Sequence, residues 1–97
     1  MEETEEIISM DEPIYIDLVN LKYVDRLNKI NKKFDSVDKL AEYVEERACR
    51  QYTTHTYPVF HSESVIIIGK NKIIELRGNF YSGIPLRSVF EVINKLK

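Results

Sequence analysis

The chain has 97 residues, a length that suits one domain and is too short for two independently stable hydrophobic cores. Its content of 43% apolar and 31% charged residues, with ten Tyr and Phe, excludes a disordered chain and predicts a packed domain. Cys49 is the only cysteine, which excludes an intramolecular disulfide. One thiol and two imidazoles are too few ligands for a structural zinc site, so we expect no metal and no cofactor.

The charge is unevenly distributed along the chain. Residues 1–12 hold six acids and no base, whereas residues 13–97 hold 10 acids and 14 bases, a formal charge of +4. We therefore divide the chain into an acidic flexible tail, 1–12, and a single domain, 13–97. The tail is either a solvated terminus or a segment that competes with an anionic ligand for a basic surface.

The acidic start is unlike a signal peptide, and no apolar run approaches a membrane span, so we expect a cytoplasmic protein with no membrane partner.

The first element predicted is a strand over residues 13–20. Ile14, Ile16 and Leu18 alternate there with Tyr15 and other residues of the opposite face, which is strand periodicity with one apolar face. Residues 21–34 are ambiguous, because apolar residues recur at every third position among asparagines and lysines that favour turns. This stretch fits a strand continuation, a short helix or a long loop.

A helix is predicted over residues 36–50. Ser36 can cap its first turn, Asp38 favours the positive end of its dipole, and apolar residues follow at helical spacing. Residues 52–61 are rich in β-forming residues but are interrupted by Pro58, so we expect one bent strand or two short ones.

The last third of the chain predicts a hairpin and a helix. Residues 65–68 and 73–76 are rich in β-branched residues and flank a turn at residues 69–72. Pro85 suits the first turn of a final helix with an apolar stripe at Leu86, Val89, Phe90, Ile93 and Leu96. The fold expected is α+β: an antiparallel sheet of about four to five strands, two main helices on one face, and the order β-α-β-β-β-α.

His55 and His61 are the only imidazoles, and they could form the acid and base pair of a metal-independent nuclease. The alternative is two histidines at strand edges without a catalytic role. Six residues separate them, so a shared face requires a regular strand through Pro58. We therefore expect a protein that is not an enzyme and has no catalytic residues.

Three segments carry a resemblance to a known family: residues 36–44, residues 57–60 (Tyr-Pro-Val-Phe) and the hairpin at 64–76. With the final helix, they resemble one half-repeat of the TATA-box-binding protein family, in which a strand, a helix, antiparallel strands and a long final helix form half a saddle. The resemblance implies this fold. It does not extend to the wedges that the family inserts into the minor groove, because Ile68 stands where a phenylalanine would fall.

These observations predict a small non-enzymatic binding or regulatory protein that contacts DNA or RNA through its sheet face. The predicted contacts are Lys70, Lys72 and Arg77 to phosphate, Tyr57 to a base or sugar, and Ile66 and Ile68 as apolar groove contacts. The alternative is a protein-interaction or inhibitor module that docks through its tail or a sheet edge; the small nuclease is a second alternative. We also expect a homodimer, because the hairpin is apolar on both faces and one half-repeat can form a saddle only by pairing.

Overall fold

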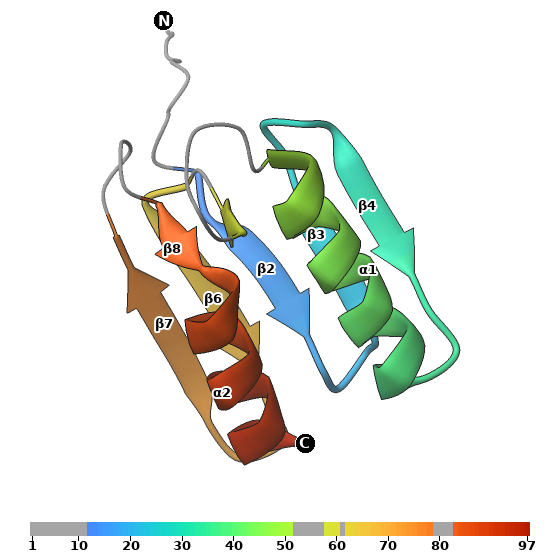
Figure 1. Ribbon diagram of the computed structural model, residues 1–97. Helices are drawn as coiled ribbons and strands as arrows, with labels where there is room; N and C mark the ends of the chain where they lie inside the picture. Colours follow the sequence, from blue (N-terminus) through green and yellow to red (C-terminus); the bar gives the residue numbers. More distant parts are fainter. Residues whose placement is uncertain (1–11, 52–57, 61, 79–82) are drawn as a thin grey trace, which may run out of the picture.

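The computed structural model describes residues 12–51, 58–60, 62–78 and 83–97, without the side chains of residues 49–51. In this part of the chain, a five-stranded sheet and a two-stranded pair accompany two helices (Figure 1). The elements in chain order are β2 (Ile14–Asp17), β3 (Lys22–Asp25), β4 (Ile30–Lys33), α1 (Val37–Gln51), β5 (Val59–Phe60), β6 (Ser64–Ile68), β7 (Ile73–Arg77), β8 (Ile84–Pro85) and α2 (Leu86–Leu96).

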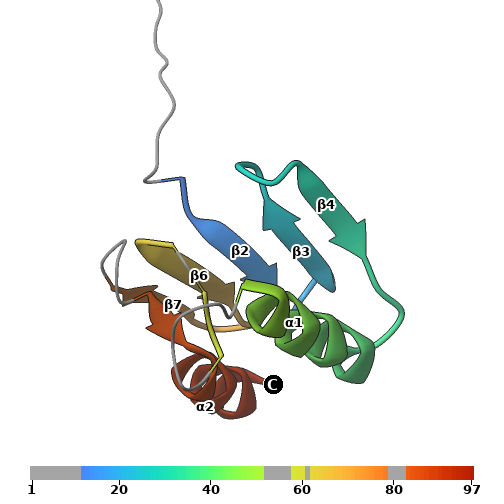
Figure 2. The same ribbon diagram turned by 45° about the horizontal axis from the view of Figure 1, so that its top comes forward.

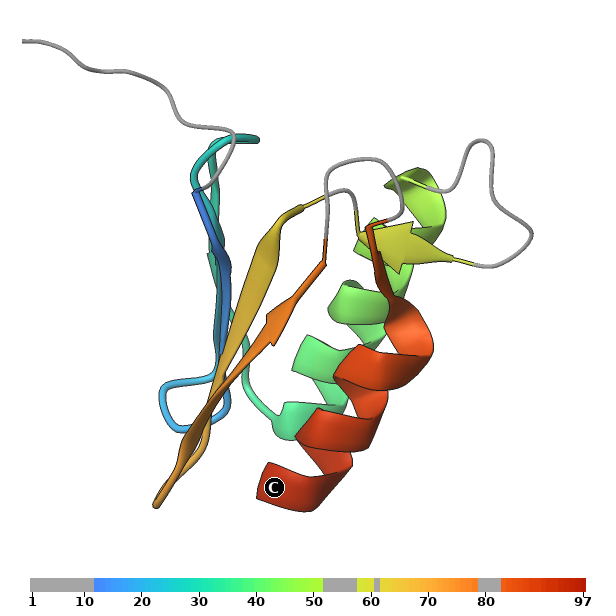
Figure 3. The ribbon, with the colours of Figure 1, turned by 90° about the vertical axis from the view of Figure 1, so that its left-hand side faces the viewer.

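Both helices lie on the same face of the main sheet (Figure 3). Figure 2 shows α1 beneath the half formed by β2, β3 and β4, and α2 beneath the half formed by β6 and β7. The predicted α+β class, with two helices on one face, is therefore confirmed. Of the acidic tail, only Glu12 is among the described residues. Tyr57 also lies outside them.

The sheet is mostly antiparallel, as predicted, but it contains one parallel pair. Its strand order is β4-β3-β2-β6-β7, with β2 and β6 parallel and the other pairs antiparallel. The chain leaves the β2–β4 meander through α1 and returns to the side of β2, and such a crossover makes a parallel pair. Three strands precede α1, so the element order also differs from the predicted order and from the order that the family resemblance implied.

The ambiguous residues 21–34 form β3, β4 and the loops that lead into them. Both loops are built in the same way: an aspartate at the strand end accepts hydrogen bonds from the backbone and side-chain amides of an asparagine three residues later, at 2.8–3.3 Å. The next residue has a positive φ, 57° at Leu21 and 58° at Lys29. Such a left-handed residue turns the chain back into an antiparallel strand. The two sets are Asp17, Asn20 and Leu21, then Asp25, Asn28 and Lys29.

The hydrophobic core lies between the sheet and the helices. Strand alternation directs Ile14, Ile16 and Ile67 into it, and α1 and α2 supply the residues that pack against them; the main helical contributors are Leu40, Val44, Val89 and Ile93. The predicted α1 is confirmed, with the Ser36 Oγ accepting a hydrogen bond from the Lys39 backbone at 3.2 Å.

The final helix differs in detail from its prediction. Pro85 is its N-cap and lies in extended conformation, and Val92 is buried in place of Phe90 and Leu96, which are half-buried at the edge of the core. Ahead of this helix, β8 pairs with β5. Gly83 at the start of this pairing has φ 69°, and a Cβ there would lie 2.5 Å from the Phe60 carbonyl oxygen. Only glycine fits this close approach.

Candidate functional site

No helix of the described chain covers the face of the main sheet opposite α1 and α2 (Figure 3). We call it the open face. Strand alternation and the pairing register assign its side chains, since directly paired residues share a face. They are Tyr15 and Asp17 of β2, Lys22 and Val24 of β3, Asn31 and Lys33 of β4, Ser64, Ile66 and Ile68 of β6, and Ile73, Glu75 and Arg77 of β7.

The middle of the open face is apolar. Tyr15 lies directly between Val24 on one neighbouring strand and Ile66 on the other, and all three side chains are half-buried. Toward one end of the sheet, Ile68 pairs with Ile73, whose side chain is 64% exposed. An aromatic ring with aliphatic neighbours therefore stays accessible at the centre of a sheet.

Cations surround this apolar middle. Lys22 and Lys33 are paired at one end of the face. Arg77 lies at the other end, because it pairs with Ser64, the residue before Val65, which pairs with Ile14 at the start of β2. Arg26 lies at the same end, because it directly follows Asp25, which also pairs with Ile14. Three of the four side chains are exposed and Lys22 is half-buried. The face thus carries positive charge at both ends of its apolar centre.

The two acids of the open face are both engaged. Glu75 accepts a hydrogen bond from Arg77 at 3.0 Å. The Asp17 carboxylate accepts hydrogen bonds from the backbone amides of Val19 and Asn20, each at 2.9 Å, and from the Asn20 side chain. Partial desolvation raises the pKa of Asp17, but these hydrogen bonds and the charge of Lys22 outweigh it and hold the pKa below its usual value. Asp17 is therefore a charged turn anchor.

Arg26 connects the apolar centre with the chain before β2. Its guanidinium lies 5.9 Å from the centroid of the Tyr15 ring, and one of its nitrogens lies 3.4 Å from a carboxylate oxygen of Glu12. Around this contact the open face is hollowed by about 190 Å³. The lining residues are Tyr15, Asp17, Lys22, Val24, Arg26 and Ile68.

The residues predicted from the sequence are only partly brought together. Ile66, Ile68 and Arg77 lie on the open face, whereas Lys70 and Lys72 lie in the turn beyond its end. Lys70 lines a different hollow with Leu96 and Lys97 of the helix side. Tyr57 lies outside the described residues, as do His55 and His61 of the nuclease hypothesis.

The sequence analysis missed Lys22, Arg26 and Lys33 as candidate contacts because residues 21–34 had no assigned structure. It missed Tyr15 because, without that structure, no cations were placed beside the predicted strand 13–20. The signal that could have found them is the repeated Asp-x-x-Asn spacing, which begins at Asp17 and again eight residues later. An aspartate that bonds to the following backbone marks a turn. Two such turns predict a three-stranded meander, which places these cations beside Tyr15.

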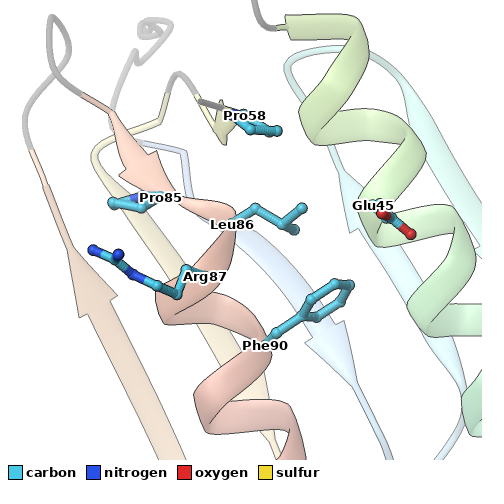
Figure 4. Close-up of a pocket in the computed structure, with 6 residues that line it drawn as sticks. All are labelled: Glu45, Pro58, Pro85, Leu86, Arg87 and Phe90. Carbon is cyan, nitrogen blue, oxygen red and sulfur yellow. The ribbon is translucent and has the colours of Figure 1, made fainter. Parts of the chain in front are cut away.

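A larger cleft, of about 460 Å³, lies between the two helices on the other side of the molecule. Figure 4 shows Leu86 and Phe90 extending from α2 toward Glu45 of α1, while Arg87 extends away from them. Pro58 and Pro85 complete the lining. The cleft is mostly apolar and does not gather several polar groups of the described chain, so it offers no acid and base pair for catalysis.

A buried polar pair lies under α1. Tyr23 is fully buried, and neither its hydroxyl nor the Nε of Arg47 has a hydrogen-bond partner. Burial raises the pKa of Tyr23 well above its ordinary value, the charge of Asp25 raises it further, and the nearby charge of Arg47 opposes the rise. A neutral phenol enclosed in the core cannot reach a substrate.

Searches against family models, curated proteins and solved structures find no match for this chain. Within the described residues, no three His, Cys, Asp or Glu side chains gather closely enough to bind a metal ion. Nor does the described part of the chain contain a helix with the length and apolarity needed to span a membrane.

Proposed function

We propose that the protein is a non-enzymatic binding module that contacts nucleic acid through its open face. The observation that carries the proposal is the accessible apolar centre, Tyr15 with Val24 and Ile66, between cations at both ends. Cations supply phosphate contacts, and aromatic and aliphatic groups supply contacts to bases. A cytoplasmic location is part of the proposal, and it is supported by the single cysteine.

The charge of the face favours a polyanion over a neutral partner. Its two acids are engaged with Arg77 and with the turn after β2, so Lys22 and Lys33 remain for an incoming ligand. Arg26 is held by an exposed ion pair with Glu12, which a phosphate can replace. The domain without its tail has a formal charge of +4, which supports moderate, salt-sensitive affinity.

The salt dependence gives the first test. If a single strand contacts all four cations of the open face and replaces the surface carboxylates beside Arg26 and Arg77, the logarithm of its affinity falls with the logarithm of salt at a slope of about −3. An increase from about 50 to about 200 mM salt then weakens binding about 50-fold. Fluorescence anisotropy with labelled oligonucleotides measures this slope. An absence of binding to single-stranded and duplex probes at low salt would refute the proposal.

Charge reversal localises the contact. Lys22→Glu/Lys33→Glu changes the open face, and Lys39→Glu/Lys95→Glu makes the same charge change on exposed residues of the two helices. We expect the first pair to weaken binding at least about tenfold more than the second, because short-range phosphate contacts are lost in addition to net charge. Equal losses would mean that the open face is not the contact surface. Lys70→Glu/Lys72→Glu tests the turn cations in the same assay.

The second candidate is a protein-interaction module whose open face binds another copy of the chain. The observation that favours it is the exposure of Ile73, which pairs with Ile68 and extends the apolar centre toward the edge strand β7. Sedimentation of a homodimer would give about twice the mass of 11.4 kDa. Ile73→Lys should return such a dimer to the monomer; a monomer at high concentration would count against this candidate.

A further inference from the structure

We infer that the nucleic acid recognised by the open face is single-stranded, and that one unpaired base stacks on Tyr15 in the hollow between β2 and β3. This inference rests on the proposed function and adds the class of ligand and the residue that reads it. It is carried by the position of Tyr15, the width of the sheet and the identity of the groups around the ring.

Tyr15 offers the only aromatic ring among the described residues that register assigns to the open face. It is half-buried between Val24 and Ile66, so its neighbours hold the ring in place while part of it stays accessible. An ordered ring loses little conformational entropy when a ligand binds, and base stacking on aromatic rings is tolerant of base identity.

Arg26 is placed to complete such a subsite. Its guanidinium already lies over the Tyr15 ring, and its side chain is 67% exposed with one surface ion pair to Glu12. A surface ion pair of this kind contributes little, so exchanging Glu12 for a phosphate costs little. A base on Tyr15 can then lie beside the guanidinium while the phosphate is held by Arg26 or Lys22, which line the same hollow.

The dimensions of the sheet disfavour duplex DNA. Five strands at about 4.8 Å spacing make a surface about 19 Å across, whereas the major groove is about 12 Å wide. Minor-groove binding by a sheet depends on apolar wedges that unstack base steps. The aliphatic groups at the centre of this face, Ile66 and Val24, are half-buried beside Tyr15 and do not project as wedges. In a duplex the base faces are also occupied by stacking, which leaves Tyr15 without a partner.

A tryptophan at position 15 tests the stacking directly. The chain has no Trp, so Tyr15→Trp introduces a single indole reporter, and Phe90→Trp places the matched control on the helix side. We titrate each full-length variant with an oligothymidylate and an oligouridylate of about 12 nucleotides and with a duplex of equal length. Stacking predicts quenching of the indole at position 15 by a single strand and none at position 90; the two single strands distinguish DNA from RNA.

Affinity measurements complete the test. Tyr15→Phe should bind within about twofold of the original chain, and Tyr15→Ala and Tyr15→Leu should bind about 5- to 100-fold more weakly, because Leu keeps the apolar volume without the aromatic face. Circular dichroism and thermal unfolding verify that each variant is folded. Tighter binding to the duplex, or losses below about twofold in a folded Tyr15→Ala, would overturn the stacking inference and leave the proposed function standing. No binding to any probe at low salt would overturn both.

Discussion

The buried phenol of Tyr23 gives a stability prediction that depends on a single oxygen atom. The Tyr23 ring is fully buried and packs edge-on against Tyr43, with 5.1 Å between the ring centroids, but its hydroxyl has no hydrogen-bond partner. A buried polar group without a partner costs about 1–3 kcal/mol. Tyr23→Phe keeps the ring and removes that cost. Because the charge of Arg47 offsets part of it, we expect the variant to be about 1 kcal/mol more stable at neutral pH.

The same substitution changes the alkaline limit of stability. The pKa of Tyr23 is raised above its ordinary value of 10.0 in the folded state, so above about pH 10 the unfolded chain loses this proton first. The free energy of unfolding therefore keeps this contribution below pH 10. Above pH 10 it falls by up to about 1.4 kcal/mol per pH unit because of this group. Tyr23→Phe removes this slope.

Urea unfolding monitored by circular dichroism between about pH 7 and pH 11 measures both effects. Tyr43→Phe is the matched control, because Tyr43 is half-buried and its hydroxyl is not enclosed without a partner. We expect it to change stability by less than about 0.5 kcal/mol. A Tyr23→Phe variant that is less stable than the original chain by about 1 kcal/mol would refute the reasoning, since the hydroxyl must then form a hydrogen bond, with Arg47 as the nearest candidate.

Three further predictions concern the turns, the tail and the final helix. Lys29→Gly should stabilise the chain by about 0.5–1 kcal/mol in urea unfolding, because glycine removes the strain of a positive φ. A loss of stability would show that residue 29 does not adopt the left-handed conformation. Deleting residues 2–12 should change the unfolding midpoint little but strengthen oligonucleotide binding at low salt, because it removes all six tail acids, including Glu12, the partner of Arg26. Unchanged affinity would exclude competition by the tail. Ile93→Ala should lower the free energy of unfolding by about 2–5 kcal/mol, because Ile93 is buried. Phe90→Ala should lower it by about half of the 3–5 kcal/mol typical of a fully buried phenylalanine, because Phe90 is half-buried. Equal losses at the upper end would mean that Phe90 is enclosed.

The elements with strong local signals could be predicted from the sequence. Ser36 precedes an apolar pattern of helical spacing, and the helix begins at Val37 with the expected cap. The hairpin at 64–77 likewise has two β-branched runs around a short turn. Such elements are predictable because the residues that form them are close neighbours in sequence.

The meander at 14–33 could not be predicted in the same way. Its turns end in Leu21 and Lys29, residues that seldom adopt a positive φ, where a glycine would have marked the turn. The parallel pairing of β2 with β6 joins segments about 50 residues apart, and no local pattern specifies such a pair. The candidate surface depends on both features, since they bring Val24 and Ile66 to the two sides of Tyr15. Sequence reasoning found Ile66, Ile68 and Arg77 because they lie on the predicted hairpin.

The most direct measurement is a nuclear magnetic resonance titration of isoleucine-methyl-labelled protein with a short oligothymidylate at low salt. Ile66, Ile68 and Ile73 report on the open face, while Ile84 and Ile93 report on the helix side. Binding through the open face predicts shifts at the first three methyl groups that saturate with the ligand, and little change at the other two. Shifts confined to Ile84 and Ile93, or no shifts at saturating oligonucleotide, would contradict the assignment of the open face as the nucleic-acid contact.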